Sequence, residues 1–318
     1  MEWLVPARIA QALQGMDFGL PEQDVVPEIP ALLNRTVLMG GKRMRPALCL
    51  MMGGVFGLDL EKVKPFARAI ELTHAASLAH DDVIDEALLR RQRQTLNAAA
   101  SNVRAVLAGD LLLARVMAEV SRLGPLKVIE DLAGSVEDLV RGEWLQDGLR
   151  GQVTVDREVL DQVALLKTGS LLRFCAVAPA RLAGASESQV QACARLGEAI
   201  GVAFQWVDDV LDFDAHAGKR PSQDLQAGLL NSVTVEMLRE DPSLVIGLGQ
   251  ILGRERPSFE WPWSVAQLAQ AQDRVRNRAA DALQDASRLL NEVVGPKSDP
   301  ECVESFQQFF VLLANRAT

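Results

Sequence analysis

Apolar residues recur at a helical spacing along almost the whole chain, and this pattern most constrains the fold. Leucine and alanine dominate the apolar positions, tyrosine is absent, and alternating runs of β-branched residues are scarce. Side chains that repeat every three to four residues line one face of a helix, whereas a strand needs strict alternation. We therefore expect an all-α fold, with proline and glycine marking the helix ends. The expected helices are 3–14, 28–38, 44–56, 62–88, 97–122, 126–148, 156–183, 187–214, 226–240, 264–293 and 299–315.

The chain has the length of one large domain or of two ordinary ones, at 318 residues. No stretch has the composition of a linker long enough to separate two domains, so we expect one domain over residues 1–318. The segment 241–263 is the least regular, and we interpret it as a helix end followed by a variable loop. Its Trp261 and Trp263 flank a proline, which favours local packing over a binding site.

Charge and cysteine content argue against several classes of protein. The net charge of −9 speaks against a general nucleic-acid binder, although a local basic pocket can still bind a small anion. The 4 cysteines are scattered and form neither a zinc pattern nor a disulfide framework. The N-terminal stretch lacks a signal-peptide pattern, and the longest apolar stretch, 46–58, is too short to span a bilayer. We expect a cytoplasmic protein without a transmembrane segment, which a lipid-like ligand can still draw to a membrane surface.

Two aspartate clusters stand far apart in this helical sequence. They are Asp81, Asp82 and Asp85 and, much later, Asp208, Asp209 and Asp212. In each cluster the first and last aspartates are spaced to lie one turn apart on the same helix face. Like charges at this spacing repel one another, whereas a hard divalent cation such as Mg²⁺ takes carboxylate oxygens and bridges them to phosphates. The pattern therefore predicts metal binding, with a capping or surface role for each cluster as the alternative.

Basic residues accompany these clusters along the chain. Two glycines and three cations open a helix at 40–46, where backbone N–H groups can approach an anion. Arg90 and Arg91 follow the first cluster, Lys167 lies in an apolar helix, and Lys219 follows the second cluster. Such cations are the usual ligands of diphosphates, so a site for two diphosphates is expected. Taken alone, the loop also fits a solvated surface, and Lys167 fits a side chain whose stem lies along apolar surface.

The order of these features resembles the trans-isoprenyl diphosphate synthases, the head-to-tail polyprenyl synthetase family. The resemblance is carried by the loop Gly41–Pro46, the run His74–Asp85 with Arg90 and Arg91, Gly109–Ala114, Gly142-Glu143 with Gln146, Lys167-Thr168, Phe204–Asp212, Gly218-Lys219 and Asp224-Leu225. It implies a single large helical bundle of the isoprenoid synthase type around a central active-site cavity. The two aspartate helices would face one another across that cavity.

By this resemblance the chain is a Mg²⁺-dependent trans-prenyltransferase that joins isopentenyl diphosphate to an allylic diphosphate, with about three ions when substrate is bound. The primary metal ligands would be Asp81, Asp85 and Asp208, supported by Asp82, Asp209 and Asp212. The allylic diphosphate would contact Arg90, Lys167 and Lys219, and isopentenyl diphosphate would contact Lys42, Arg45, His74 and Arg91. Thr168 and Gln205 would present oxygen dipoles to the developing allylic cation. The family is expected to form homodimers, with an apolar helix such as 97–122 as a candidate interface.

One block departs from the family pattern. After Asp224-Leu225 the family usually has Gly-Lys, a small residue and Thr, whereas residues 228–231 read Gly-Leu-Leu-Asn here. Leu229 thus replaces a lysine on the phosphate side, which leaves the grip on the allylic diphosphate open. Gly197 and Gly201, one turn apart and one turn before Gln205, predict a close approach of either a neighbouring helix or the prenyl chain.

Product length is inferred from the helix that enters the first cluster. Ala76 and Ser77 lie about one turn before Asp81, and small side chains there leave a channel open. We expect an all-trans polyprenyl product longer than geranylgeranyl, from hexaprenyl to decaprenyl. A short-chain farnesyl or geranylgeranyl synthase is the alternative, with a plug from another position. The candidate plugs are Phe56, Phe66, Met117 and Trp144.

Two other hypotheses differ in class. A non-catalytic regulatory subunit of a heteromeric synthase would typically have eroded aspartate clusters, and here both are whole, although Leu229 keeps this alternative open. A class I terpene cyclase would need an Asn/Ser/Glu metal triad, and Asn231, Ser232 and Glu236 have the wrong spacing for it. The favoured function therefore remains prenyl transfer, with no nucleic-acid partner.

Overall fold

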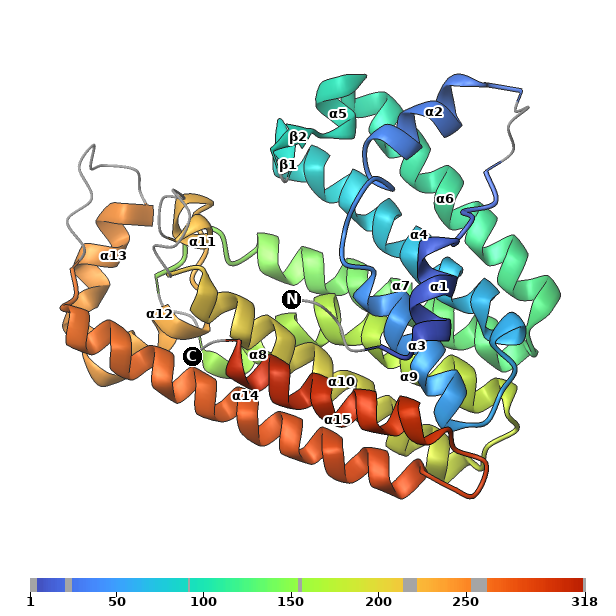
Figure 1. Ribbon diagram of the computed structural model, residues 1–318. Helices are drawn as coiled ribbons and strands as arrows, with labels where there is room; N and C mark the ends of the chain where they lie inside the picture. The colour runs from blue at the N-terminus through green and yellow to red at the C-terminus, as the bar shows by residue number, and fades with distance from the viewer. Residues whose placement is uncertain are drawn as a thin grey trace. The chain divides into compact units, whose positions relative to one another are not determined.

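The computed structural model describes residues 5–20, 25–90, 92–153, 156–213, 222–252 and 262–316. It confirms the all-α fold, since the described elements are helices apart from one two-stranded hairpin (Figure 1). The chain forms two compact units, each assembled from three separate stretches. Unit 1 comprises Met1–Gly134, Phe174–Val190 and Val294–Ser305, and unit 2 comprises Ser135–Arg173, Gln191–Val293 and Phe306–Thr318. The expectation of a single domain over 1–318 stays a prediction.

Unit 1 contains the N-terminal helices and the hairpin. They are α1 (Ala7–Gln14), α2 (Glu28–Arg35), α3 (Met44–Val55), α4 (Leu60–Ile84), β1 (Leu89–Arg90), β2 (Arg93–Gln94), α5 (Leu96–Ala99) and α6 (Asn102–Leu123). Side chains cap the two long helices at their starts. Asp59 accepts from Glu61 N at 3.1 Å before α4, and Ser101 accepts from Arg104 N at 3.2 Å before α6.

Helices α4 and α6 lie side by side in unit 1 (Figure 1). Ile70 of α4 and Leu112 of α6 are fully buried, and burial of each such side chain contributes about 1.5–3 kcal/mol. At the end of α4 the contact depends on Gly109, because a Cβ added there would lie 2.3 Å from His80 Nε2. The core thus holds the end of α4 against α6, where the first aspartate cluster begins.

Unit 2 contains most of the remaining helices. They are α8 (Arg157–Ala164), a π-helical turn (Leu165–Gly169), α11 (Gln223–Gln226), α12 (Ser232–Glu240), a 3-10 turn (Pro242–Leu244), α13 (Val245–Leu252) and α14 (Val265–Val293). Other helices include residues of both units, namely α7 (Leu126–Asp147), α9 (Ser170–Leu182), α10 (Glu187–Leu211) and α15 (Pro300–Asn315). Within unit 2, α12 packs along α14 (Figure 1).

Two glycines let α10 touch the backbone of the preceding helix. A Cβ added at Gly197 would lie 2.4 Å from Leu172 O, and one added at Gly201 would lie 2.4 Å from Gly169 Cα. Real Cβ atoms do not approach other atoms so closely, so glycine is required at both positions. Gly197 and Gly201 were expected to admit either a neighbouring helix or the prenyl chain. The structure shows a neighbouring helix at both positions.

Several elements differ from those expected. Residues 226–240 are not one helix, because α11 ends at Gln226, Gly228 has a φ of 81°, and Asn231 then caps α12 by accepting from Thr234 N at 3.2 Å. The expected helix 62–88 ends at Ile84, and the hairpin that follows is too short to show alternation. The expected helix 97–122 is divided into α5 and α6.

The segment 241–263 is more regular than expected. A 3-10 turn and α13 occupy its first half, and residues 253–261, with Trp261, lie outside the described part of the chain. Trp263 is buried, with its ring centroid 6.1 Å from that of Phe213 in an edge-to-face arrangement. The expected packing role is confirmed for Trp263.

One helical stretch, Arg157–Leu182, is long and apolar enough to cross a membrane by length and composition alone. However, 78% of its most apolar window is buried inside the protein, as in the core helix of a soluble protein. It is therefore weak evidence for a membrane span.

Candidate functional site

The first aspartate cluster occupies the C-terminal end of α4. Asp81 lies in the last turn, and its carbonyl accepts from the N–H of Asp85 at 2.8 Å, which places Asp85 one turn later as the C-cap. Asp81 is half-buried and Asp85 is exposed. The expected one-turn spacing of these two carboxylates is confirmed.

The middle aspartate of this cluster is committed to local structure. Asp82 is 1% exposed, and its Oδ1 accepts from Arg90 Nε at 2.8 Å and forms an ion pair with Arg90 Nη2 at 2.8 Å. Burial raises the pKa of the Asp82 carboxyl, and the charge and hydrogen bonds of Arg90 partly offset that rise. Asn97 donates to the backbone carbonyl of Asp82 at 3.1 Å. Arg90 thus ties the hairpin to the end of α4, and its contact with a diphosphate stays a prediction.

The second cluster is built in a similar way at the end of α10. Asp208 is exposed, whereas Asp209 is 6% exposed and accepts from Gln205 Nε2 at 2.9 Å and from the backbone N–H of Ser232 at 3.0 Å. Burial raises the pKa of Asp209 to about 6, although the hydrogen bonds from Gln205 and Ser232 act in the opposite direction. In both clusters, therefore, the middle carboxylate is anchored inside its unit.

Asp212 lies just after α10 and organises the start of α11. Its carboxylate accepts from the backbone N–H groups of Gln223 at 2.8 Å and Asp224 at 3.2 Å, and its carbonyl accepts from Ser222 N at 2.7 Å. Asp212 thus fixes the chain that returns after residues 214–221, which the structure does not describe.

Asp224 is a functional candidate that the sequence analysis missed. Its Oδ2 accepts from Asn231 Nδ2 at 3.0 Å, and its own N–H is held by Asp212. Burial, followed by the charges of Asp209 and Asp212, raises the pKa of Asp224 to about 8. Asp224 belongs to one of the sequence blocks that carry the family resemblance. Its separation from Asp212 in the sequence, however, does not correspond to the one-turn spacing of a helix. Only the fold of α11 back onto the cluster brings these carboxylates together.

Lys167 and Thr168 lie in the π-helical turn rather than in a regular helix. Short π-helical segments within α-helices are frequent at functional sites. Lys167 Nζ donates to Gln146 Oε1 at 2.6 Å and pairs with Glu143, both from α7. A Cβ at Gly142 of α7 would lie 2.9 Å from Lys167 N, so this glycine admits the turn. Glu143 and Gln146 belong to one block of the sequence and Lys167 to another, and the structure brings the two blocks into contact.

A chain of side-chain hydrogen bonds connects this turn to the second cluster. Thr168 Oγ1 donates to Gln205 Oε1 at 2.9 Å, and Gln205 Nε2 donates to Asp209. The expected oxygen dipoles of Thr168 and Gln205 are therefore neighbours. Their action on an allylic cation stays a prediction.

The basic loop opens a helix, α3, as expected, and three of its residues have positive φ. Gly40, Gly41 and Arg43 have φ values of 77°, 86° and 46°, respectively. Arg43 has a structural role, because its Nη1 donates to Leu13 O at 3.0 Å and its guanidinium lies 4.9 Å from the Phe18 ring centroid. Lys42 is exposed and Arg45 is half-buried at the start of α3. These two cations, rather than Arg43, remain the candidates for binding an anion.

Other candidate residues are placed as follows. His74 is half-buried on α4, two turns before Asp81, and its carbonyl accepts from Ser77 Oγ at 2.9 Å. His80, which received no role in the sequence analysis, has its Nε2 at 3.4 Å from Asp110 Oδ1 and at 3.2 Å from Val106 O. Arg91 and Lys219 lie outside the described residues.

The donor set fits a hard cation that is shared with a ligand. Carboxylate oxygens suit Mg²⁺ and Ca²⁺. In the part of the chain that the structure describes, no three His, Cys, Asp or Glu side chains gather closely enough to hold a metal ion by themselves. An ion at either cluster would therefore need further oxygen atoms, which a diphosphate supplies.

Comparisons with known proteins agree with this chemistry. A family model described as polyprenyl synthetase matches residues 26–260. Octaprenyl diphosphate synthase of Escherichia coli (strain K12) is 34% identical over 224 residues, which are 69% of each chain. The all-trans-nonaprenyl-diphosphate synthase (geranyl-diphosphate specific) of Rhodobacter capsulatus is 34% identical over 228 residues, 70% of each chain. A match to decaprenyl-diphosphate synthase of Dictyostelium discoideum, also 34% identical, spans 70% of this chain and 50% of that relative.

Solved structures share the fold over nearly the whole chain. A decaprenyl diphosphate synthase from Rhodobacter capsulatus superposes with a TM-score of 0.85 and 26% identity, covering 98% of this chain and 97% of that one. A polyprenyl synthase from Caulobacter crescentus CB15, complexed with calcium and isoprenyl diphosphate, has a TM-score of 0.78 and 26% identity, covering 96% and 93%.

Proposed function

Because this chain belongs to the polyprenyl synthetase family, we propose that it is a polyprenyl diphosphate synthase. It condenses isopentenyl diphosphate head-to-tail with an allylic diphosphate, and its all-trans product is longer than geranylgeranyl. The observation that carries the proposal is that both aspartate clusters are complete and alike, each with its middle carboxylate anchored by hydrogen bonds. The octaprenyl and nonaprenyl diphosphate synthases among its relatives support the long product.

Mg²⁺ is the proposed cofactor, in about three ions per site when substrate is bound. When bound, it would screen the negative charge of the allylic diphosphate so that the C–O bond can ionise. The calcium ion in the Caulobacter crescentus structure and the preference of hard cations for carboxylates support this choice. Asp81, Asp85 and Asp208 would be the primary ligands, with Asp82, Asp209 and Asp212 in support.

The remaining residues would bind and orient the two substrates. Lys167, Arg90 and Lys219 would contact the allylic diphosphate, and Thr168 with Gln205 would turn their oxygen atoms toward the allylic cation. Isopentenyl diphosphate would contact Lys42, Arg45, His74 and Arg91. Its double bond attacks the allylic cation to form the new C–C bond, and the proton lost from the adduct passes to the released diphosphate.

Burial on the helix leading to the first cluster does not by itself distinguish a long product from a short one. Ala76 is fully buried and Ser77 is half-buried, so the small side chains belong to the packed face of α4. Of the candidate plugs, Phe66 packs against Gly124, where an added Cβ would lie 3.0 Å from its ring, and Trp144 is 83% exposed. Neither observation favours a short-chain enzyme.

We also propose a cytoplasmic homodimer that releases its product at a membrane surface. Exposed apolar side chains on α6 of unit 1 support a partner surface, since large apolar groups in water favour association. They are Val103, Val106 and Leu107. Light scattering coupled to gel filtration tests this, and a monomer at micromolar concentration would contradict it.

A product assay tests the proposed function. Purified protein incubated with Mg²⁺, isopentenyl diphosphate and farnesyl diphosphate should release diphosphate and form a longer prenyl product, seen by chromatography. Asp81→Ala and Asp208→Ala should each abolish turnover while helicity by circular dichroism is unchanged. Hydrocarbon formed from the allylic diphosphate alone would indicate a terpene cyclase. A protein inactive alone that changes the product of another synthase would indicate a regulatory subunit.

A further inference from the structure

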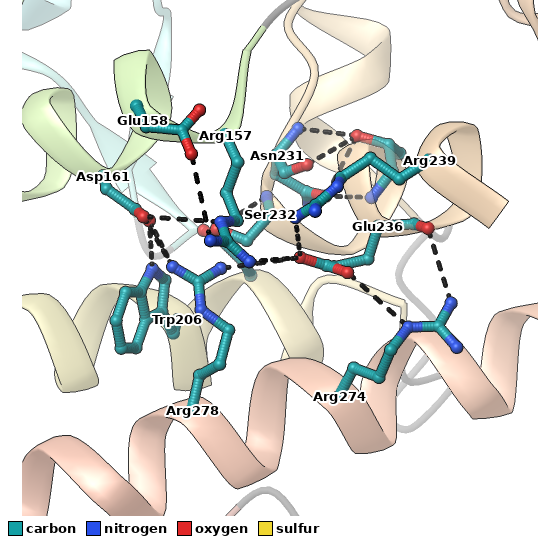
Figure 2. Close-up of polar contacts among 12 residues, drawn as sticks. Arg157, Glu158, Asp161, Trp206, Asn231, Ser232, Glu236, Arg239, Arg274 and Arg278 are labelled. Atoms are coloured by element: carbon teal, nitrogen blue, oxygen red, sulfur yellow. Dashed lines mark hydrogen bonds and ion pairs between the residues drawn. The ribbon is translucent and has the colours of Figure 1, made fainter. Parts of the chain in front are cut away.

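A buried carboxylate ringed by arginines lies in unit 2 (Figure 2). Glu236 of α12 is 5% exposed. Its Oε1 faces Arg157 Nη1 at 3.7 Å, Arg239 Nη1 at 3.5 Å and Arg278 Nη1 at 3.7 Å, and its Oε2 faces Arg274 Nε at 3.5 Å. We call Glu236 and these four arginines the Glu236 cluster. It joins α8, α12 and α14, since Arg157 begins α8, and Arg274 and Arg278 lie one turn apart on α14.

The cluster is held by charge more than by hydrogen bonds. Among the residues that the structure describes, Glu236 Oε1 has no hydrogen-bond partner, and neither have the buried Arg157 Nε, Arg274 Nε and Arg278 Nη1. A buried carboxylate is costly unless cations surround it, and cations left behind after its removal are costly in turn. Displacement of α12 along α14 would separate these charges. The cluster therefore restricts α12 to one position within unit 2.

A second contact extends the cluster to α10. Arg278 Nη2 donates to both carboxylate oxygens of Asp161, at 2.7 and 2.6 Å, and its guanidinium lies 4.1 Å from the Trp206 ring centroid. The Trp206 indole N–H donates to Asp161 Oδ1 at 3.1 Å. Arg278 thus connects Glu236 to Asp161 of α8 and to Trp206 of α10 (Figure 2).

Each helix that the cluster joins to α14 also contacts, carries or leads to a candidate site residue. One turn before Glu236, the N–H of Ser232 donates to Asp209, and Asn231 donates to Asp224. Asp161 lies on α8, which runs directly into the π-helical turn of Lys167. Trp206 follows Gln205 on α10. The cluster contains none of the residues proposed to contact substrate, yet it holds three helices that contact, carry or lead to candidate site residues.

We infer that Glu236 is a positioning residue for the second aspartate cluster, acting through α12 and the Ser232–Asp209 hydrogen bond. This inference rests on the proposed function. Glu236→Gln keeps the shape of the side chain and removes its charge, so the arginines lose their common counter-ion and α12 loses its fixed position. Apparent Mg²⁺ affinity and kcat should fall by about 10- to 100-fold, as is typical when groups that orient metal ligands are removed. The KM for isopentenyl diphosphate should not change, because Lys42, Arg45 and His74 belong to unit 1.

The test compares the full-length wild type, Glu236→Gln and a matched control. Glu119→Gln removes a half-buried carboxylate that pairs with Arg68 in unit 1, so it perturbs the fold without touching α12. One readout is the rise in melting temperature caused by Mg²⁺ with inorganic pyrophosphate, and the other is steady-state kinetics. We expect Glu236→Gln to lose most of the ligand-induced rise and to show the metal and kcat defects. Glu119→Gln should keep the full rise, whatever its own melting temperature.

The outcomes separate the two proposals. An inactive wild type that does not respond to Mg²⁺ with pyrophosphate overturns the proposed function and the inference with it. If the wild type is active, either of two results overturns the inference and leaves the proposed function intact. One is that Glu236→Gln keeps the wild-type thermal response, and the other is that Glu119→Gln loses the response as much as Glu236→Gln does. Should Glu236→Gln fail to fold, Arg274→Gln decides, because it removes a cation that faces Glu236 from α14. An Arg274→Gln protein with wild-type metal affinity then overturns the inference.

Discussion

The hydroxyl of Thr168 donates a 2.9 Å hydrogen bond to the side-chain carbonyl oxygen of Gln205. The bond decides which way the Gln205 amide faces, because its NH₂ group is then turned to Asp209, 2.9 Å away. With the opposite amide orientation, a carbonyl oxygen would face the carboxylate of Asp209 and repel it. A hydroxyl on the π-helical turn therefore acts on the second aspartate cluster through one intervening side chain.

The first prediction concerns this hydroxyl. Thr168→Val keeps the shape of the side chain and removes the donor, so the Gln205 amide loses its preferred orientation. We expect the free energy of unfolding to fall by about 1 kcal/mol and kcat to fall by about tenfold or more, through a weaker hold on Asp209. Thr36→Val is the control, since its hydroxyl donates to Leu32 O far from both clusters in the sequence. Equal kcat values for Thr168→Val and wild type would contradict the role.

The second prediction concerns the close approach of α10 to the π-helical turn. In Gly201→Ala, the new Cβ would lie 2.4 Å from Gly169 Cα, a backbone atom that cannot rotate away. We expect a loss of roughly 1–3 kcal/mol in urea unfolding, as for other overpacked cores, together with lower activity. Gly134→Ala on α7 is the control, because nothing lies within 4 Å of its new Cβ. That change should be neutral or stabilising, by up to about 1 kcal/mol. Similar effects of the two alanines would show that the contact is not tight.

The local geometry of the two aspartate clusters could be predicted from the sequence, because the residues of each cluster lie close together at the end of a helix. The one-turn spacing of Asp81 and Asp85 follows from helical geometry alone, and the same geometry puts the two glycines of α10 on one face, which indicates a close approach. Capping explains the error over 226–240, since Gly228 and the Asn231–Thr234 capping box interrupt a segment whose apolar spacing still looks helical.

What the sequence could not supply is contact between distant segments. Asp82 and Asp209 look alike in the two clusters, yet one is anchored by Arg90 from a hairpin and the other by a backbone N–H of α12. Backbone donors have no signature in the sequence. The Glu236 cluster was equally hidden, because its arginines are spread over α8, α12 and α14. The sequence pattern suggested Glu236 only as a member of a metal triad.

The third prediction is a pH dependence of stability without divalent ions. Burial raises the pKa of Asp209 to about 6 and that of Asp224 to about 8, and the charge of Asp209 adds to the rise at Asp224. Above the unfolded-state pKa of about 4, the folded protein binds protons that the unfolded chain has released. The free energy of unfolding should therefore fall as pH rises from about 4 to about 8.

Asp224→Asn tests this pH dependence. The amide keeps an oxygen for Asn231 and removes one titrating group, so the slope should decrease by up to about 1.4 kcal/mol per pH unit. The variant should also be more stable than wild type near pH 8 in EDTA, as measured by urea unfolding. Asp285→Asn, an exposed carboxylate paired with Arg288, serves as the control and should leave the slope unchanged. If the free energy of unfolding of Asp224→Asn changes with pH as steeply as that of the wild type, the raised pKa of Asp224 is contradicted.

The fourth prediction concerns product length. Ala76 is fully buried on α4, about one turn before Asp81, so a phenylalanine there would fill space beside the path proposed for the growing chain. Ala76→Phe should shift the product to fewer isoprene units in a chromatogram, at a cost of about 1–3 kcal/mol in stability from overpacking. Ala69→Phe, also fully buried on α4 but two turns earlier, is the control for overpacking. An unchanged product distribution in a folded Ala76→Phe protein would place the channel elsewhere.

The fifth prediction separates two roles of Arg90, the anchoring of Asp82 and the proposed contact with diphosphate. Arg90→Gln leaves the 1% exposed Asp82 carboxylate without its cation, so the free energy of unfolding should fall by about 1–3 kcal/mol. Adding Asp82→Asn removes the buried charge and should restore most of that loss. If Arg90 also contacts the allylic diphosphate, the double variant will still have a raised KM for farnesyl diphosphate. Recovery of both stability and KM would show that Arg90 acts only through Asp82.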